Sequence, residues 1–182
     1  MSMSARWVWC DLEMTGLDPY VSRIIEIASI ITDSDLNIIA EGPSIVIHQP
    51  EIALQDLSPW IYDHHGQSGL LDAVRKSNVT LAQAQSRTLD FIKDYVEPGK
   101  SPLCGNSIGT DRAFLQRHMP DLSAYLHYRN IDVTSIKLVL DKWCPHHAEL
   151  RKKGAHRALD DIKESIDQLR VYRNFILSKP TE

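Results

Sequence analysis

The chain is organised around one stretch near its N-terminus, Trp7-Val8-Trp9-Cys10-Asp11-Leu12-Glu13-Met14-Thr15-Gly16-Leu17-Asp18-Pro19. It reads as an apolar strand that ends in acids, and Asp11 and Glu13 share one face because strand side chains alternate. Two carboxylates held this close repel each other unless a cation lies between them. Hard Mg²⁺ or Mn²⁺ prefers such oxygen ligands. Asp-x-Glu is also common as two solvated acids on an edge strand, so the rest of the chain must decide between these interpretations.

Length and composition favour a single globular domain over residues 1–182. The chain is 43% hydrophobic and 24% charged, which is ordinary for such a domain. No window is long and apolar enough for a membrane span, and the N-terminus lacks the apolar segment of a signal peptide. The three cysteines fit a reducing compartment better than a disulfide framework. We therefore expect a cytoplasmic protein with no membrane partner.

Charge restricts the kind of partner. A net charge of −4 argues against a broad basic surface for long nucleic acid, but a metal and a few cations could still hold a short substrate. Cys144 lies close to His146 and His147, yet no second ligand pair stands at finger spacing, so zinc is not expected. The basic run at residues 151–153 is interpreted as a solvated loop face that could also steer an anionic substrate.

The first third of the chain predicts an antiparallel meander. Strands are expected at residues 6–10, at the β-branched run 24–32, and at 37–40, with 45–48 continuing or following the last one. Ser58-Pro59 is typical of a helix start, and Gly66 and Gly69 are expected to break that helix. The sequence from Thr80 to Gln83 predicts a capping box for the next helix.

The remainder alternates between strand and helix. Short strands are predicted at residues 102–106 and 131–133, each followed by a helix; Pro120 ends the first of these helices and Thr134 caps the second. A last helix carries apolar residues at helical spacing around Ile162 and Ile166. Strands followed by alternating helix and strand predict an α/β domain with a mixed sheet and helices packed on it.

Three more positions can join the acidic pair. Asp111 follows a predicted strand, where active sites of α/β sheets often lie. His156 follows Gly154 in a loop and suits a general base, and Asp161 falls early in the last helix. Each acid could equally be a helix-start residue stabilised by the dipole, and His156 a solvated loop residue. Asp160 competes with Asp161, which we favour because it adjoins the core residue Ile162.

Taken together, these motifs resemble a known family. The order Asp11-x-Glu13, Asp111 and His156-x-x-x-x-Asp161 is similar to the DEDDh 3′-to-5′ exonucleases. The amino-acid sequences of three segments narrow the resemblance to the oligoribonuclease branch of that family: residues 9–17, 104–109 and 156–162. The resemblance covers nearly the whole chain and is weakest over residues 145–153.

The resemblance implies one DEDDh exonuclease domain with an RNase H-like fold, in which helices flank a mixed five-stranded sheet. It also implies a homodimer that removes 5′-mononucleotides from very short single-stranded RNA, especially dinucleotides. Asp11, Glu13 and Asp161 would hold a first Mg²⁺ or Mn²⁺, and Asp11 would also touch a second, with Asp111 completing the set. His156 would deprotonate the attacking water. Two cations roughly 3.5–4 Å apart can stabilise both the entering and the leaving oxygen.

Substrate-binding residues follow from the same resemblance. Leu17 would wedge between the last two bases and Trp60 would stack on a base, although core packing is the competing interpretation for both. A further group would grip the 5′ end of the substrate, with the tyrosine arriving from the partner subunit: His65, Ser107, Tyr128, Arg129 and Thr134. For Arg129 the alternative is a solvated surface cation.

Two other functions remain open at this point. A DEDDh exonuclease acting on single-stranded DNA ends would use the same metal chemistry, because that chemistry does not involve the 2′-hydroxyl. A non-catalytic nucleic-acid-binding module on the same fold would have lost one or more acids, whereas here all four stand beside the histidine. The short chain without a basic patch and the oligoribonuclease-like sequence outside the motifs favour the RNA enzyme.

Overall fold

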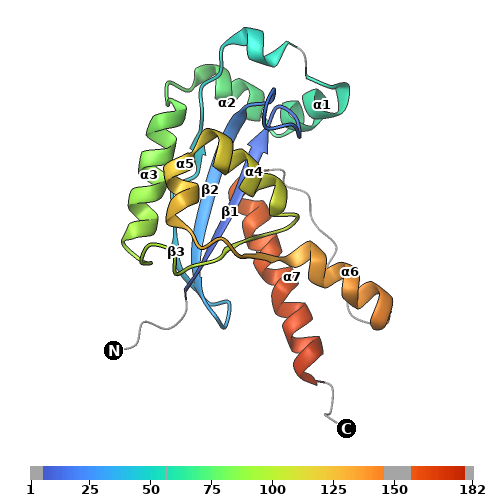
Figure 1. Ribbon diagram of the computed structural model, residues 1–182. Helices are drawn as coiled ribbons and strands as arrows, with labels where there is room; N and C mark the ends of the chain where they lie inside the picture. Colours follow the sequence, from blue (N-terminus) through green and yellow to red (C-terminus); the bar gives the residue numbers. More distant parts are fainter. Residues whose placement is uncertain (1–5, 56, 146–156, 179–182) are drawn as a thin grey trace.

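The computed structural model describes residues 6–55, 57–145 and 157–178, which form a layered α/β fold (Figure 1). The strands are β1 (Arg6–Met14), β2 (Ile24–Asp33), β3 (Ile38–Glu41), β4 (Ile45–Val46), β5 (Leu103–Gly105) and β6 (Asn130–Asp132). The helices are α1 (Pro59–Gln67), α2 (Leu70–Lys76), α3 (Leu81–Lys93), α4 (Gly109–His118), α5 (Pro120–Tyr125), α6 (Val133–Trp143) and α7 (Ala158–Ser178), with a 3-10 turn at Glu51–Leu54. None of these helices combines the length and the apolar composition needed to cross a membrane.

The strands form one mixed sheet in the order β3-β2-β1-β5-β6. β1 and β2 pair antiparallel along their whole length, from Arg6 opposite Asp33 to Met14 opposite Ile24. β5 and β6 continue the sheet in parallel with β1. β4 is a sixth, short strand that pairs with β2 beyond the end of β3, so the two lie in line on one edge. The predicted mixed-sheet α/β class is thereby confirmed, with the short β4 as an addition to the five strands that were expected.

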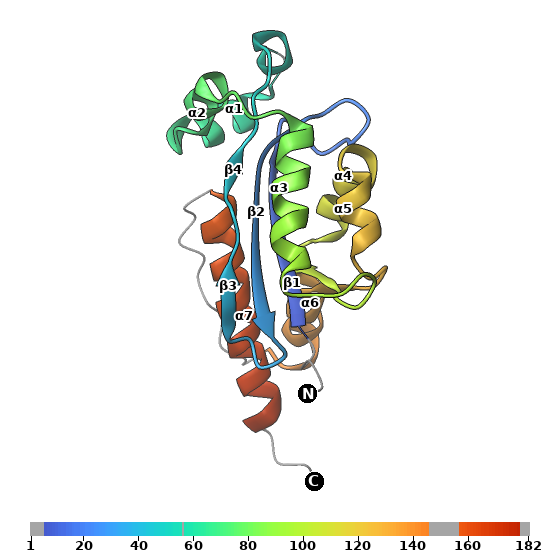
Figure 2. The ribbon, with the colours of Figure 1, turned by 90° about the vertical axis from the view of Figure 1, so that its left-hand side faces the viewer.

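Alternation along β1 decides which layer each side chain enters. Val8, Cys10 and Leu12 pack with residues of α3, α4 and α5. Trp9 points the other way and packs with residues of α6 and α7. Figure 2 shows the sheet from its edge, with α7 on one side and α3, α4 and α5 on the other. Because side chains two apart share a face, Asp11 lies on the same side as Trp9, toward α7.

Several local details differ from the prediction. β1 does not end at Cys10 but runs on to Met14, so the acids lie within the strand. α1 continues through Gly66, and the break comes at Gly69, whose φ of 71° suits glycine. The Asp132 side chain, rather than Thr134, caps α6 by accepting a hydrogen bond from the Thr134 N–H. The short helices α2 and α5 were not predicted.

Candidate active site

Three carboxylates meet where β1 passes the start of α7. Asp11 and Glu13 come from one face of β1, and Asp161 comes from the first turn of α7. Each offers an oxygen that lies within 4.8 Å of the others. Asp160 is exposed, whereas Asp161 is half-buried and belongs to this acid cluster. Alternation in the strand and the position of Asp161 next to buried Ile162 therefore bring together the residues that the sequence singled out.

Asp111 reaches the same strand from the opposite layer. Asp111 is 6% exposed, and its Oδ1 accepts a hydrogen bond of 3.0 Å from the backbone N–H of Leu12. Leu12 lies between the two acids of β1, so this bond fixes Asp111 against the backbone of the acid cluster. The contact joins residues 99 apart in the sequence and holds the start of α4 on β1.

The cluster is electrostatically unfavourable in the protein alone. Burial is the largest cause of the raised pKa of Glu13, which moves from 4.5 to about 8. Three neighbouring carboxylates raise this pKa further, namely those of Asp161, Glu26 and Asp111. The guanidinium of Arg157 opposes the rise. Burial also raises the pKa of Asp111 from 3.8 to about 7, against the effect of its backbone hydrogen bonds. Such a set of close oxygen donors fits a divalent cation, whose charge would offset the repulsion.

An ion pair that sequence reasoning missed lies beside the cluster. Glu26 faces Glu13 across the β1–β2 ladder and has no exposed surface. The Arg157 Nη2 donates a hydrogen bond of 2.6 Å to Glu26 Oε1, and its Nε lies 3.1 Å from both carboxylate oxygens. His156, the predicted base, lies outside the described residues, and Arg157 is the next residue in the chain.

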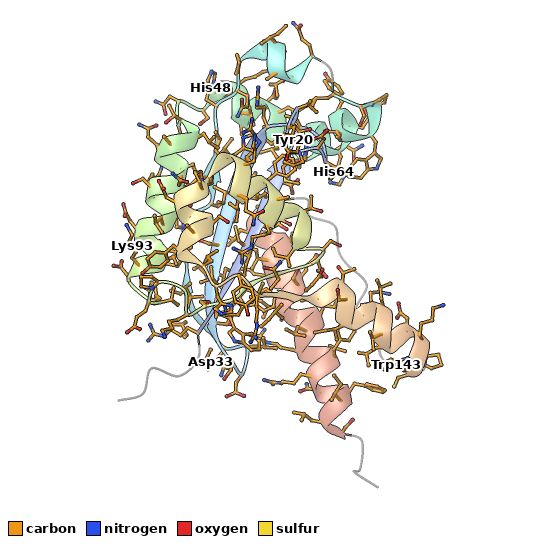
Figure 3. All side chains as sticks on the ribbon, in the orientation of Figure 1. Tyr20, Asp33, His48, His64, Lys93 and Trp143 are labelled. Carbon is orange, nitrogen blue, oxygen red and sulfur yellow. The ribbon has the colours of Figure 1, made fainter. Side chains whose placement is uncertain are left out.

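The residues predicted to contact bases lie near the same end of β1. Leu17, in the loop after β1, is 78% exposed, and Trp60 on α1 is 69% exposed. Core packing is thus ruled out for both. The Trp60 ring stacks on that of His64, with centroids 4.5 Å apart; Figure 3 labels His64 on α1. His65 is buried and lies against Glu13, with Nδ1 3.8 Å from Oε2 and Nε2 3.0 Å from the Met14 carbonyl oxygen.

The other predicted substrate contacts form two groups. Ser107 and Thr134 meet between β5 and α6: the Ser107 N–H donates to Thr134 Oγ1 at 3.0 Å, and Ser107 adopts a φ of 49°. Tyr128 is 77% exposed, and the Arg129 guanidinium lies 5.5 Å from its ring centre. These two residues directly precede β6, which lies two strands across the sheet from β1. The structure therefore does not bring them into the acid cluster of their own chain.

Comparison with known proteins first shows the class to which this chain belongs. Residues 8–169 match the RNase T family model, which describes exonucleases. Solved exonuclease I structures share the fold. One has a TM-score of 0.73 at 16% identity over 94% of this chain. Another, the zinc-bound E. coli ExoI–ssDNA complex, has a TM-score of 0.74 at 16% identity over 96% of this chain. This chain spans only about two fifths of the exonuclease I chains. The protein is thus a member of the RNase T exonuclease family.

Full-length relatives narrow that class. The oligoribonuclease of Marinobacter nauticus is 54% identical over 96% of this chain and 97% of its own length. The mitochondrial oligoribonuclease of Mus musculus is 51% identical over the whole of this chain and 77% of its own length. Within the exonucleases, the chain belongs to the oligoribonuclease family.

Proposed function

We propose that this protein is a 3′-to-5′ exoribonuclease that degrades very short oligoribonucleotides, especially dinucleotides, to 5′-mononucleotides. The observation that carries the proposal is the acid cluster of Asp11, Glu13 and Asp161, whose oxygens lie within 4.8 Å of one another in a chain of the oligoribonuclease family. Asp111 adjoins the cluster through the Leu12 backbone. Four carboxylates gathered from three distant segments suit phosphodiester hydrolysis assisted by metal ions.

The proposed chemistry assigns a role to each polar group. Asp11, Glu13 and Asp161 would hold one divalent ion, Mg²⁺ or Mn²⁺; Asp11 would also touch a second, and Asp111 would complete the carboxylate set. When bound, such ions neutralise the scissile phosphate and the charge that develops on the entering and leaving oxygens. His156 accepts the proton of the attacking water. His65, which lies against Glu13, is proposed to contact the substrate as one of the residues that grip its 5′ end.

Substrate contacts in this proposal divide by position. Leu17 wedges between the last two bases and Trp60 stacks on one, consistent with their exposure near the acid cluster. Ser107, Thr134 and Arg129 hold the 5′ end. For Arg129, which lies two strands away from β1, the separation suits the far end of a short substrate better than contact with the acids.

Tyr128 completes the site of a second subunit in a homodimer. It is 77% exposed and lies away from its own acid cluster. α6 exposes a group of large apolar side chains suited to a subunit contact: Leu138, Val139 and Trp143. Trp143 lies at the outer end of α6 (Figure 3). A two-fold dimer would then form two closed sites, each completed in trans.

The compartment stays a prediction, and we place the protein in the cytoplasm.

Mononucleotide release from labelled diribonucleotides, longer RNA and single-stranded DNA tests this function. We expect the highest turnover on the diribonucleotide and its loss in EDTA. Preference for DNA ends would favour a DNA exonuclease, and binding without cleavage would favour a non-catalytic module. Mixing an Asp11→Ala subunit with a Tyr128→Ala subunit tests the dimer, because one site per mixed dimer keeps both groups. Verified heterodimers without regained activity would refute the shared site.

A further inference from the structure

The Glu26–Arg157 ion pair joins the sheet to the first turn of α7. Glu26 has no exposed surface and accepts hydrogen bonds from the Arg157 side chain, from the Ala158 backbone N–H at 3.3 Å and from Ser44 Oγ at 3.2 Å. The Arg157 carbonyl oxygen in turn accepts from the Asp161 N–H at 3.0 Å. One carboxylate on β2 thus holds both the side chain and the backbone with which α7 begins.

This pair bears directly on the acid cluster. Arg157 directly precedes α7, and its carbonyl oxygen accepts the hydrogen bond from Asp161 in the first turn, so the two residues are joined across one turn. Glu26 lies opposite Glu13 in the β1–β2 ladder. Anchoring the first turn of α7 at Glu26 therefore fixes the position of Asp161 along β1, beside Asp11 and Glu13.

Stability alone does not account for a charged pair at this position. The Glu26 carboxylate is fully buried and the Arg157 side chain is 37% exposed, and the free-energy cost of taking a charge out of water is regained only in part by such a pair. Here the acidic partner also faces another carboxylate, an arrangement that is unfavourable in a sheet. The guanidinium offsets this charge, and it is also the cation that opposes the raised pKa of Glu13.

We propose that Glu26 and Arg157 are positioning residues that hold Asp161 beside Asp11 and Glu13 and so set the affinity of the acid cluster for divalent cations. The proposal rests on the metal-dependent function proposed above. Neither residue needs to touch the substrate. Groups that orient metal ligands typically change metal affinity by 10–100-fold when they are altered.

Calorimetric titration of the full chain with Mn²⁺ alone tests the proposal. Arg157→Gln and Glu26→Gln should bind Mn²⁺ about 10–100-fold more weakly than the unaltered chain. Turnover of Glu26→Gln and Arg157→Gln should recover at high Mn²⁺, because the ligands themselves remain. Lys163→Gln is the matched control: Lys163 also joins α7 to the sheet, through Glu41 at 2.9 Å, but the Glu41 carboxylate is exposed whereas that of Glu26 is buried. The control should bind Mn²⁺ like the unaltered chain.

Each outcome decides between the alternatives. Folded variants that bind Mn²⁺ with unchanged affinity overturn the positioning role but leave the proposed function standing. An unaltered chain that binds no Mn²⁺ overturns both. If Arg157→Gln does not fold, Arg157→Lys decides by the same criterion, since it keeps the charge but loses the two-pronged contact; unchanged affinity in that variant refutes the proposal.

Discussion

Replacing Glu13 by glutamine should stabilise the metal-free protein at neutral pH, although it removes a proposed metal ligand. The substitution keeps the shape of the side chain and removes its charge. Burial and neighbouring carboxylates raise the pKa of Glu13 from 4.5 to about 8 in the folded chain. Its side chain is 12% exposed, so solvent screens these effects only weakly. The folded protein therefore resists ionisation of Glu13, and a neutral amide at this position would not carry this cost.

The size of the effect follows from proton linkage. Between pH 4.5 and 8 the folded state keeps a proton that the unfolded state releases, so the free energy of unfolding falls as pH rises. Each pH unit in that window removes about 1.4 kcal/mol. At pH 7 the accumulated loss is about 3 kcal/mol, and above pH 8 it reaches about 5 kcal/mol. For a chain of this size, 3 kcal/mol corresponds to roughly 6–12 °C in Tm.

Urea unfolding in EDTA, followed by tryptophan fluorescence from pH 4.5 to 8, measures this difference. Glu13→Gln should match the unaltered chain at the acid end and become progressively more stable toward pH 8. Glu97→Gln, a substitution of an exposed glutamate, is the control and should show no such divergence. Adding Mn²⁺ should reverse the order, because only the unaltered chain keeps the full ligand set. A stability difference that does not change with pH in EDTA would refute the reasoning.

Three further predictions concern activity. Asp161→Asn should nearly abolish turnover with Mg²⁺ or Mn²⁺ while circular dichroism stays unchanged, whereas Asp160→Asn should stay close to normal; the reverse result would move the ligand to Asp160. His156→Ala should lower kcat by roughly 10²–10⁴-fold and remove the acid limb of the pH–rate profile, and an unchanged profile would show that the proton goes elsewhere. Trp60→Ala should raise KM for diribonucleotides by roughly 5–150-fold, since stacking on a base contributes about 1–3 kcal/mol. Tyr62→Ala, at another exposed aromatic residue of α1, is the control, and equal effects of the two substitutions would contradict stacking.

The parts of the site that could be predicted from the sequence depend on local geometry. Alternation in a strand placed Asp11 and Glu13 on one face without knowledge of any contact. Adjacency in the sequence to the core residue Ile162 favoured Asp161 over Asp160. The capping box at Thr80 forms both of its reciprocal hydrogen bonds. In each case the deciding information lies within a few residues of the chain.

The parts that could not be predicted depend on distant contacts. Glu26 sits in a β-branched run where one acid carries no pattern of its own, and its partner Arg157 is 131 residues away. Asp111 was singled out, but its hydrogen bond to the Leu12 backbone was not foreseeable. The helices α2 and α5 have only seven and six residues, too short for a clear apolar periodicity. The capping role of Asp132 was assigned to its neighbour Thr134 because both residues are good caps.

The β1–β2 register places acid opposite acid, and the fold compensates the two members of that pair differently. Glu26 receives a full counter-charge from Arg157, so it serves as an anchor. Burial and then three carboxylates raise the pKa of Glu13, and a histidine lies 3.8 Å away, so a negative charge on Glu13 would lack a full counter-charge. A second arginine there would make the metal-free protein more stable but would compete with a divalent cation for the same oxygens. Departures from local rules of this kind are expected where a chain retains function at the expense of stability. The unfavourable electrostatics that Glu13→Gln would relieve are therefore the same property that would give the acid cluster the affinity for cations proposed above.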